Sequence, residues 1–138
     1  TQLAETISAQ SSLDVTEQQV ALIAISIENG CDYCVAAHST IAAGQRVDET
    51  VLEAVRSKSP LAASRLEAVR QTAIALVETR GWLSADQKQA FFDSGFDSGQ
   101  LLDLVTLLAL KTISNYTNHL SETPLDAAFA GRRYEAAA

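Results

Sequence analysis

The chain has 138 residues, of which 47% are hydrophobic and 20% are charged, and its formal net charge is −7. This is the length of one ordinary domain, so we expect residues 1–138 to form a single domain. The acidic balance argues against nucleic acids and anionic membrane surfaces as partners, because both attract basic patches. No apolar run approaches the roughly 20 residues of a membrane span. Because the sequence contains no methionine, we expect it to be incomplete at its N-terminus.

Helical signals follow one another along the first half of the chain. Asp14 and Glu17 have the spacing of a capping box, which marks the start of a helix. Asn29 and Gly30 both tolerate positive φ and predict a break before the next helix. The predicted helices of this half cover residues 1–11, 15–28, 31–43 and 49–57.

The second half of the chain is also predicted to be helical. Pro60 is expected at the first helical position of a long helix, and Ser84 with Gln87 forms another capping box. The predicted helices cover residues 60–80, 85–93, 98–120 and a short segment from residue 124. Residues 101–113 are apolar nearly all round, so we expect this helix to be central and partly covered by another subunit. Since no stretch alternates like a strand, the predicted fold class is an all-α helical bundle without a sheet.

The chain has only two cysteines, Cys31 and Cys34, and His38 follows them at helical spacing. Two cysteines three residues apart cannot staple a fold, so the pair indicates redox chemistry or metal binding in a reducing, cytoplasmic compartment. At about 100° per residue, Cys34 lies about 300° and His38 about 340° from Cys31 around a helix. All three side chains are therefore expected on one face.

These three residue types supply what a peroxidase needs. One thiolate attacks the O–O bond, a proton donor serves the departing alkoxide, and a second thiol condenses with the sulfenic acid to a disulfide. Cys31 is expected in the first turn of a helix, where the dipole favours a thiolate. Cys34 is one turn from His38, which can take or return its proton. The residues alone leave open which cysteine attacks.

The run from Gln18 through His38 resembles the core of the carboxymuconolactone decarboxylase superfamily, and its Cys-x-x-Cys-x-x-x-His is similar to the alkylhydroperoxidase AhpD-like branch. The stretch from Lys111 to His119 resembles one found in a peroxidase-related group of that branch. The resemblance implies an AhpD-like helical bundle that assembles into trimers or hexamers. It also implies hydroperoxide reduction without metal, haem or other cofactor. Decarboxylation is not implied, because the decarboxylases lack the cysteine pair.

The resemblance also implies a role for each site residue. Cys34 would be the peroxidatic thiol, Cys31 the resolving thiol and His38 a proton relay, with a dithiol such as a lipoyl-bearing protein as reductant. The family often has a relay glutamate twelve residues before the first cysteine, where this chain has Gln19. An amide cannot carry a proton near neutral pH. The possible relay residues are therefore Gln19 itself and Glu28.

Two other functions agree with the same residues. The pair could serve a disulfide oxidoreductase or redox sensor without peroxidase turnover, which the missing glutamate favours. Alternatively, the chain is a non-enzymatic helical oligomer with a metal-bound or vestigial site. Cys31, Cys34 and His38 supply three ligands, but no second Cys or His pair stands at zinc-finger spacing.

Overall fold

A computed structural model describes residues 1–136, and within them the chain forms eight helices and no strand. The predicted all-α fold class is confirmed. The helices are α1 (Gln2–Gln10), α2 (Val15–Glu28), α3 (Asp32–Gly44), α4 (Glu49–Arg56), α5 (Ser64–Thr79), α6 (Ala85–Asp93), α7 (Ser98–Ser121) and the 3₁₀ helix η1 (Ala127–Arg132). The capping boxes predicted at the starts of α2 and α6 are both present. Within residues 1–136, no helix combines the length and the apolar composition that crossing a membrane requires.

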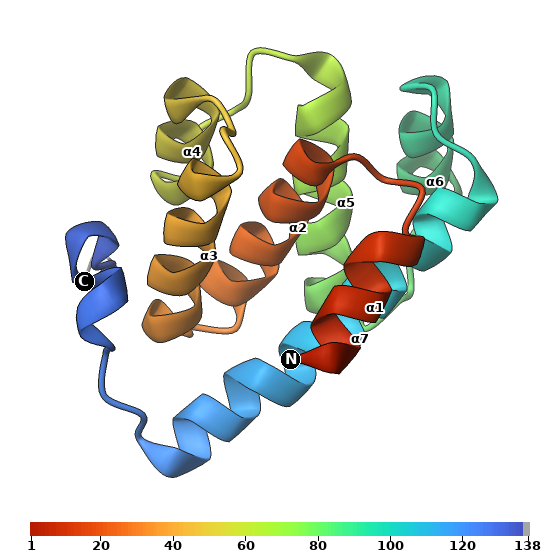
Figure 1. Cartoon of the computed structure of the whole chain (residues 1–138). Helices are drawn as coiled ribbons and strands as arrows, with labels where there is room; N and C mark the ends of the chain where they lie inside the picture. Colours follow the sequence, from red (N-terminus) through yellow and green to blue (C-terminus); the bar gives the residue numbers. More distant parts are fainter. Residues whose placement is uncertain (137–138) are drawn as a thin grey trace.

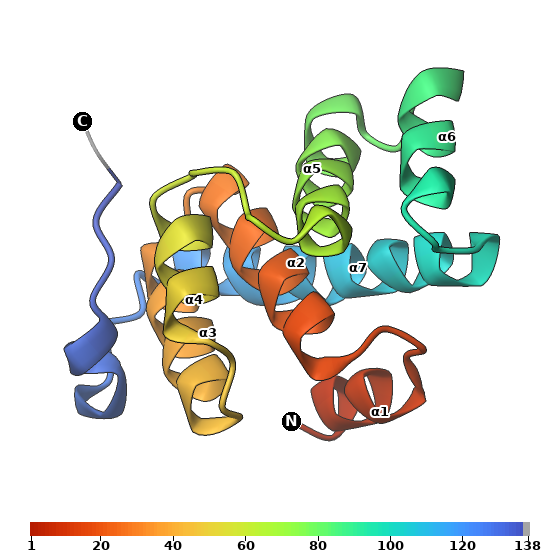
Figure 2. The same cartoon turned by 90° about the horizontal axis from the view of Figure 1, so that it is seen from above.

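Helix α2 lies at the centre of the fold and packs against α3, α4, α5 and α7. Figure 1 shows it between the α3–α4 pair and α5, with α7 crossing beneath, and Figure 2 gives the same arrangement from above. Every residue of α2 from Glu17 to Ser26 is buried. The expectation that the long helix would be central is wrong. Helix α7 buries one face only, and apolar side chains on its other face, such as Leu102 and Ile113, are exposed in the single chain.

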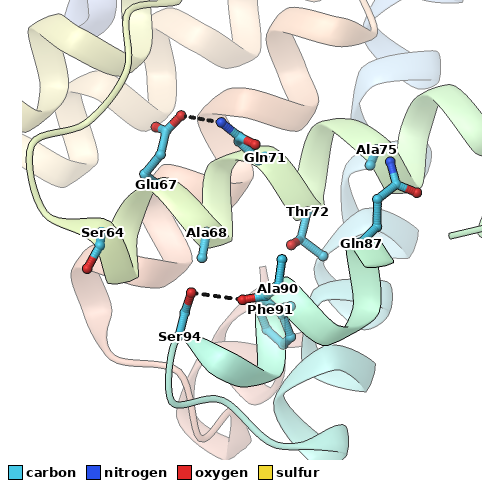
Figure 3. Close-up of a pocket in the computed structure, with 10 residues that line it drawn as sticks. All are labelled: Ser64, Glu67, Ala68, Gln71, Thr72, Ala75, Gln87, Ala90, Phe91 and Ser94. Carbon is cyan, nitrogen blue, oxygen red and sulfur yellow. Dashed lines mark hydrogen bonds between the residues drawn. The ribbon is translucent and has the colours of Figure 1, made fainter. Parts of the chain in front are cut away.

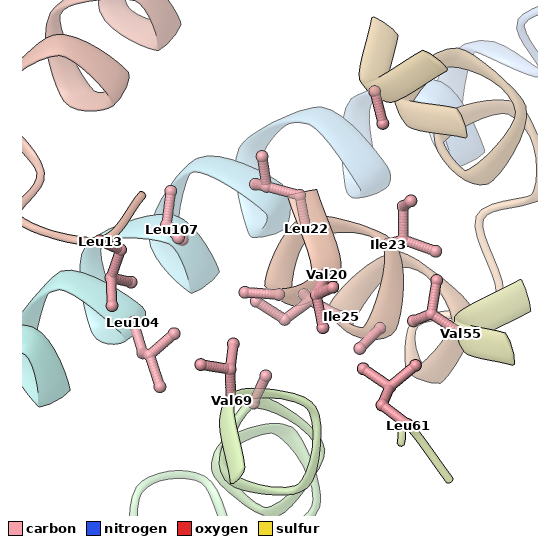
Figure 4. Close-up of a cluster of buried hydrophobic side chains, with 14 of the residues drawn as sticks. Leu13, Val20, Leu22, Ile23, Ile25, Val55, Leu61, Val69, Leu104 and Leu107 are labelled. Carbon is pink, nitrogen blue, oxygen red and sulfur yellow. The ribbon is translucent and has the colours of Figure 1, made fainter. Parts of the chain in front are cut away.

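The hydrophobic core is formed where side chains of α2 meet those of α4, α5 and α7. Figure 4 shows this meeting, with Val55, Val69 and Leu104 facing the side chains of α2. Residues Val20, Ile23 and Ile25 of α2 are completely inaccessible to solvent. Burial of this apolar surface supplies the main driving force for packing the helices around α2.

The structure differs from the sequence-based prediction at the start of α5. This helix begins at Ser64 and not at Pro60, because residues 60–63 form an irregular connection. The connection carries Leu61 into the core, where its side chain is 6% exposed. The Glu67 carboxylate accepts a hydrogen bond from the Leu61 backbone N–H at 2.8 Å. Burial of Leu61 thus overrides the helix-starting tendency of the proline. The terminal helix also begins later than predicted, at Ala127.

Candidate active site

The turn between α2 and α3 places the first cysteine. Asn29 ends α2, and Gly30 follows with φ +69°, a left-handed conformation that glycine adopts without steric cost. The Gly30 N–H donates to the Ile27 carbonyl at 3.0 Å, and the Cys31 N–H donates to the Ser26 carbonyl at 2.9 Å. This is the Schellman pattern that closes a helix. Cys31 is therefore the N-cap of α3. The helix begins at Asp32, one residue later than predicted.

The two cysteines are free thiols, each 2% exposed, and they hydrogen-bond to each other. The pKa of Cys34 is lowered to about 5, mainly because the Cys31 thiol donates this hydrogen bond. The charge of Lys111 and the Asn118 amide act in the same direction, against the effect of burial. The pKa of Cys31 is raised, first by its hydrogen bond to Cys34 and then by burial. The two pKa shifts therefore run in opposite directions and favour the thiolate at Cys34 and the thiol at Cys31.

Helix α7 supplies the polar groups that surround Cys34. The Asn118 side-chain amide donates to the Cys34 sulfur at 3.2 Å. Lys111 and Asn115, which are 3% and 0% exposed, lie on the same face of α7, since residues four and seven apart are neighbours on a helix. The side-chain amide of Asn29 donates to Oδ1 of Asn115 at 3.0 Å. This hydrogen bond connects α7 to the turn before Cys31.

His38 contacts a lysine and not a sulfur. Its Nδ1 lies 3.1 Å from Oε1 of the Gln19 side chain. Because this oxygen can only accept, Nδ1 carries the ring proton and donates the hydrogen bond to Gln19. Its Nε2 is then an acceptor, and the Lys111 Nζ lies 2.8 Å from it. Burial and the charge of Lys111 lower the pKa of His38 to about 3. His38 is therefore neutral at physiological pH, with both ring nitrogens engaged. The direct contact of His38 with Cys34 that the sequence predicted is replaced by Lys111, which contacts His38 and whose charge acts on Cys34.

Several hollows lie near these helices, and one of them has His38 in its wall. A hollow of about 440 Å³ lies between α1, α2, α3 and α7, and its wall includes Gln19 and His38 together with apolar side chains such as Leu107. Another hollow, of about 270 Å³, lies between α5 and α6, with Thr72 and Phe91 in its wall (Figure 3). None of the residues around the cysteines lines the second hollow.

The family of the chain follows from its first half. Residues 1–79, which contain the cysteines and His38, match the carboxymuconolactone decarboxylase family. The chain belongs to this family. No curated protein matches it.

Solved structures share the fold of this carboxymuconolactone decarboxylase family member. A peroxidase-related protein from Silicibacter sp. TM1040 superposes with a TM-score of 0.82 at 17% identity, covering 95% of this chain and 70% of that one. The debrominase Bmp8, crystallised as a cysteine-to-alanine variant with 2,3,4-tribromopyrrole, gives 0.81 at 16% identity, with 95% and 71% covered. An AhpD-core peroxidase-related protein from Ralstonia eutropha JMP134 gives 0.79 at 21% identity, with 97% and 73% covered. The predicted AhpD-like architecture is confirmed.

Within this family member, four of the five sequence-predicted site residues lie together. Cys31, Cys34 and His38 are at the start and in the first half of α3, and Gln19 contacts His38 from α2. Glu28 lies elsewhere, in the wall of a small hollow beside Lys58 and Arg70, and it is therefore outside the cluster. In the part of the chain that the structure describes, no group of three His, Cys, Asp or Glu side chains is arranged to hold a metal ion.

The residues of α7 that complete the site were not predicted from the sequence. Lys111, Asn115 and Asn118 belong to the stretch that resembles the peroxidase-related group, but no site role was predicted for them. Their spacing of four and three residues inside an otherwise apolar helix was the available signal. Polar residues that recur on the buried face of a helix need polar partners. Here the partners are His38 and Cys34 on α3, and Ser26 and Asn29 at the end of α2.

Proposed function

We propose that this chain is a thiol peroxidase that reduces hydrogen peroxide or small organic hydroperoxides through Cys34 and Cys31. The observation that carries the proposal is the asymmetry of the pair. The Cys34 sulfur receives hydrogen bonds from Asn118 and Cys31 and has the Lys111 ammonium beside it. Such surroundings stabilise a thiolate, which is the nucleophilic form of cysteine.

The proposed cycle uses each cysteine once. The Cys34 thiolate attacks the terminal oxygen of the hydroperoxide, the O–O bond breaks, and the alkoxide leaves and is protonated to an alcohol. The resulting Cys34 sulfenic acid condenses with the Cys31 thiol, which forms the disulfide and releases water. A dithiol then reduces the disulfide by exchange. Both cysteine residues are 2% exposed, so the proposed reductant carries its dithiol on a slender arm, as a lipoyl-bearing protein does.

The same burial favours peroxide over a protein disulfide as the oxidant. A disulfide on a folded partner cannot approach a cysteine residue that is 2% exposed, whereas a hydroperoxide has the size of a few atoms. A disulfide oxidoreductase is therefore the weaker alternative. It predicts faster reduction of insulin disulfides than consumption of hydroperoxide, and the two rates can be compared on one preparation.

Cysteine substitutions test the assignment of roles, because the chain has no third cysteine to confuse the readout. We expect brief peroxide treatment to produce an intramolecular Cys31–Cys34 disulfide, detected by alkylation and mass spectrometry. Cys34→Ser is expected to abolish peroxide turnover, and Cys31→Ser to leave a sulfenic acid at Cys34 that dimedone traps. Two free thiols after treatment of the wild-type protein would overturn the proposal. If sulfenic acid formed at Cys31 in the Cys34→Ser protein and none formed at Cys34 in the Cys31→Ser protein, Cys31 would be the peroxidatic thiol and Cys34 the resolving thiol.

A further inference from the structure

Lys111 is a buried lysine without an acidic partner. Its side chain is 3% exposed in the middle of α7, and no carboxylate lies within ion-pair distance of it in residues 1–136. A buried ammonium is strongly destabilising unless it is paired and hydrogen-bonded. The cysteine chemistry described above assigns it no task beyond its charge. Its placement therefore calls for a functional explanation.

The groups around Lys111 hold its ammonium against the reacting sulfur. On one side its Nζ lies 2.8 Å from His38 Nε2. Gln19 fixes the proton of that ring on Nδ1, so Nε2 offers its lone pair and orients one N–H of the ammonium. On the other side the Cys34 thiolate is the counter-charge, because the charges of Lys111 and Cys34 each shift the pKa of the other group. Cys31 is the other ionisable group that shifts the pKa of Lys111, and from α2 the uncharged Gln19 reaches it only through His38.

We propose that Lys111 is the catalytic acid of the peroxide reaction and that His38 positions it, an inference that rests on the proposed function. As the Cys34 sulfur bonds to the terminal oxygen and the O–O bond breaks, the alkoxide takes a proton from the Lys111 ammonium and leaves as an alcohol. The amine that remains takes the proton of the Cys31 thiol. The Cys31 thiolate attacks the Cys34 sulfenic acid, and the departing hydroxide recovers that proton as water. Reduction of the disulfide by a dithiol returns one proton to Lys111 and one to Cys31.

His38 cannot serve as this acid in the observed arrangement. Its single ring proton is on Nδ1 and is donated to Gln19, on the side of the ring away from Lys111. Its lowered pKa keeps Nε2 unprotonated at physiological pH. Lys111 combines a proton with contact to the reacting sulfur. The structure thus assigns to lysine the step that the sequence-based analysis gave to histidine.

The first test titrates Cys34 and needs no peroxide. In a Cys31→Ser background, the ultraviolet absorbance of the thiolate is followed against pH with and without Lys111→Met. Loss of an adjacent positive charge is expected to raise the Cys34 pKa by about one pH unit or more. Lys88→Met, on the exposed face of α6, is the matched control and is expected to leave the titration unchanged. An unchanged titration in Lys111→Met would overturn the pairing of Lys111 with Cys34.

The second test separates an acid from a residue that only stabilises the thiolate. Sulfenic acid formation is timed at a pH above the Cys34 pKa of each variant, with an alkyl hydroperoxide and with a peracid. A peracid expels a carboxylate, which needs no proton. Lys111→Met and Lys111→Gln are expected to be slowed roughly a hundredfold with the alkyl hydroperoxide and little with the peracid. The glutamine variant keeps a donor for His38, which guards against a purely structural loss.

The outcomes of the second test distinguish the two proposals. Equal slowing with both oxidants, or no slowing with either, would overturn the role of Lys111 as acid while leaving the peroxidase intact. A wild-type protein that reacts with neither oxidant would overturn the proposed function, and the acid role would fall with it. Circular dichroism of each variant checks that it is folded. Methionine and glutamine both fit the volume of the lysine stem.

Discussion

Asn118 on α7 donates its side-chain amide to the Cys34 sulfur on α3 over 3.2 Å, although 84 residues separate them in sequence. A hydrogen bond to a charged acceptor stabilises it more than one to a neutral acceptor. We therefore expect Asn118→Ala to raise the Cys34 pKa and to slow alkylation at mildly acidic pH by roughly tenfold. The rate of iodoacetamide labelling against pH measures this. Ser121→Ala, on the exposed last turn of α7, is the control, and equal rates in both variants would contradict the prediction.

Gln19→Glu is expected to change the pH dependence of the peroxide reaction. A carboxylate in place of the amide oxygen beside Nδ1 favours the charged imidazole and raises the pKa of His38 from its value of about 3. The protonated Nε2 would then face the Lys111 ammonium, and the repulsion between them would lower the pKa of Lys111.

The pH–rate profile with one hydroperoxide and one dithiol is the measurement for this variant. We expect the profile to shift in the neutral range and the rate to change by roughly tenfold or more. Gln19→Leu removes the acceptor without adding a charge, and it is expected to show no new ionisation. Superimposable profiles of wild-type and Gln19→Glu would place Gln19 outside the proton path.

The neutral state of His38 predicts a loss of stability in acid. The folded protein binds a proton at His38 only near pH 3, whereas the unfolded chain binds it near the ordinary value of 6.5. Between these values the unfolded state takes up more protons, so the free energy of unfolding decreases as the pH falls from about 6.5 toward about 3. Above pH 6.5 this contribution is fully present.

Urea unfolding at neutral and mildly acidic pH tests this for three proteins. His38→Gln removes the titrating group, so this variant is expected to lose less stability on acidification than the wild type. His119→Gln, on the exposed part of α7 where the ring stacks on Tyr116, is expected to behave like the wild type. An identical loss in all three proteins would assign the acid sensitivity to the carboxylates.

The outer face of α7 supports the proposal that the chain assembles into a trimer or a multiple of one. Leu102, Ile113, Tyr116 and Leu120 are between 55% and 87% exposed in the single chain, and they follow one another along this face. Contiguous apolar surface of this kind is typical of a subunit interface. The only Lys, Arg, Asp or Glu in α7 after Asp103 is the buried Lys111, so no such charge interrupts the stripe.

We expect light scattering to give a mass above that of the monomer at micromolar concentration. Ile113→Glu puts a charge into the middle of the stripe and is expected to produce monomers. Ala62→Glu, in the exposed connection before α5, is the matched control and should keep the mass of the wild type. A monomeric wild-type protein would contradict the proposal.

Much of the fold was predictable because its signals are local. The caps at Asp14 and Ser84 act within one turn, and the break at Gly30 needs only a residue that accepts positive φ. The placement of Cys34 one turn before His38 also follows from helical geometry alone. The start of α5 and the identity of the central helix were predicted wrongly. Both depend on where apolar side chains find their partners, and the burial of Leu61 overrides a local preference.

The sequence alone determined the helices, the family resemblance and the presence of a dithiol with a nearby histidine. The hydrogen bond from Cys31 that favours a thiolate at Cys34 is local, but the charge of Lys111 and the amide of Asn118 reach Cys34 only through the tertiary structure, because both residues are on α7. Lys111 and His38 are 73 residues apart in sequence, and their nitrogens meet at 2.8 Å because α3 and α7 both pack on α2 and also contact each other. Electrostatic effects act through space, so residues far away in the chain order add to the effect of the neighbouring Cys31 on the pKa of Cys34.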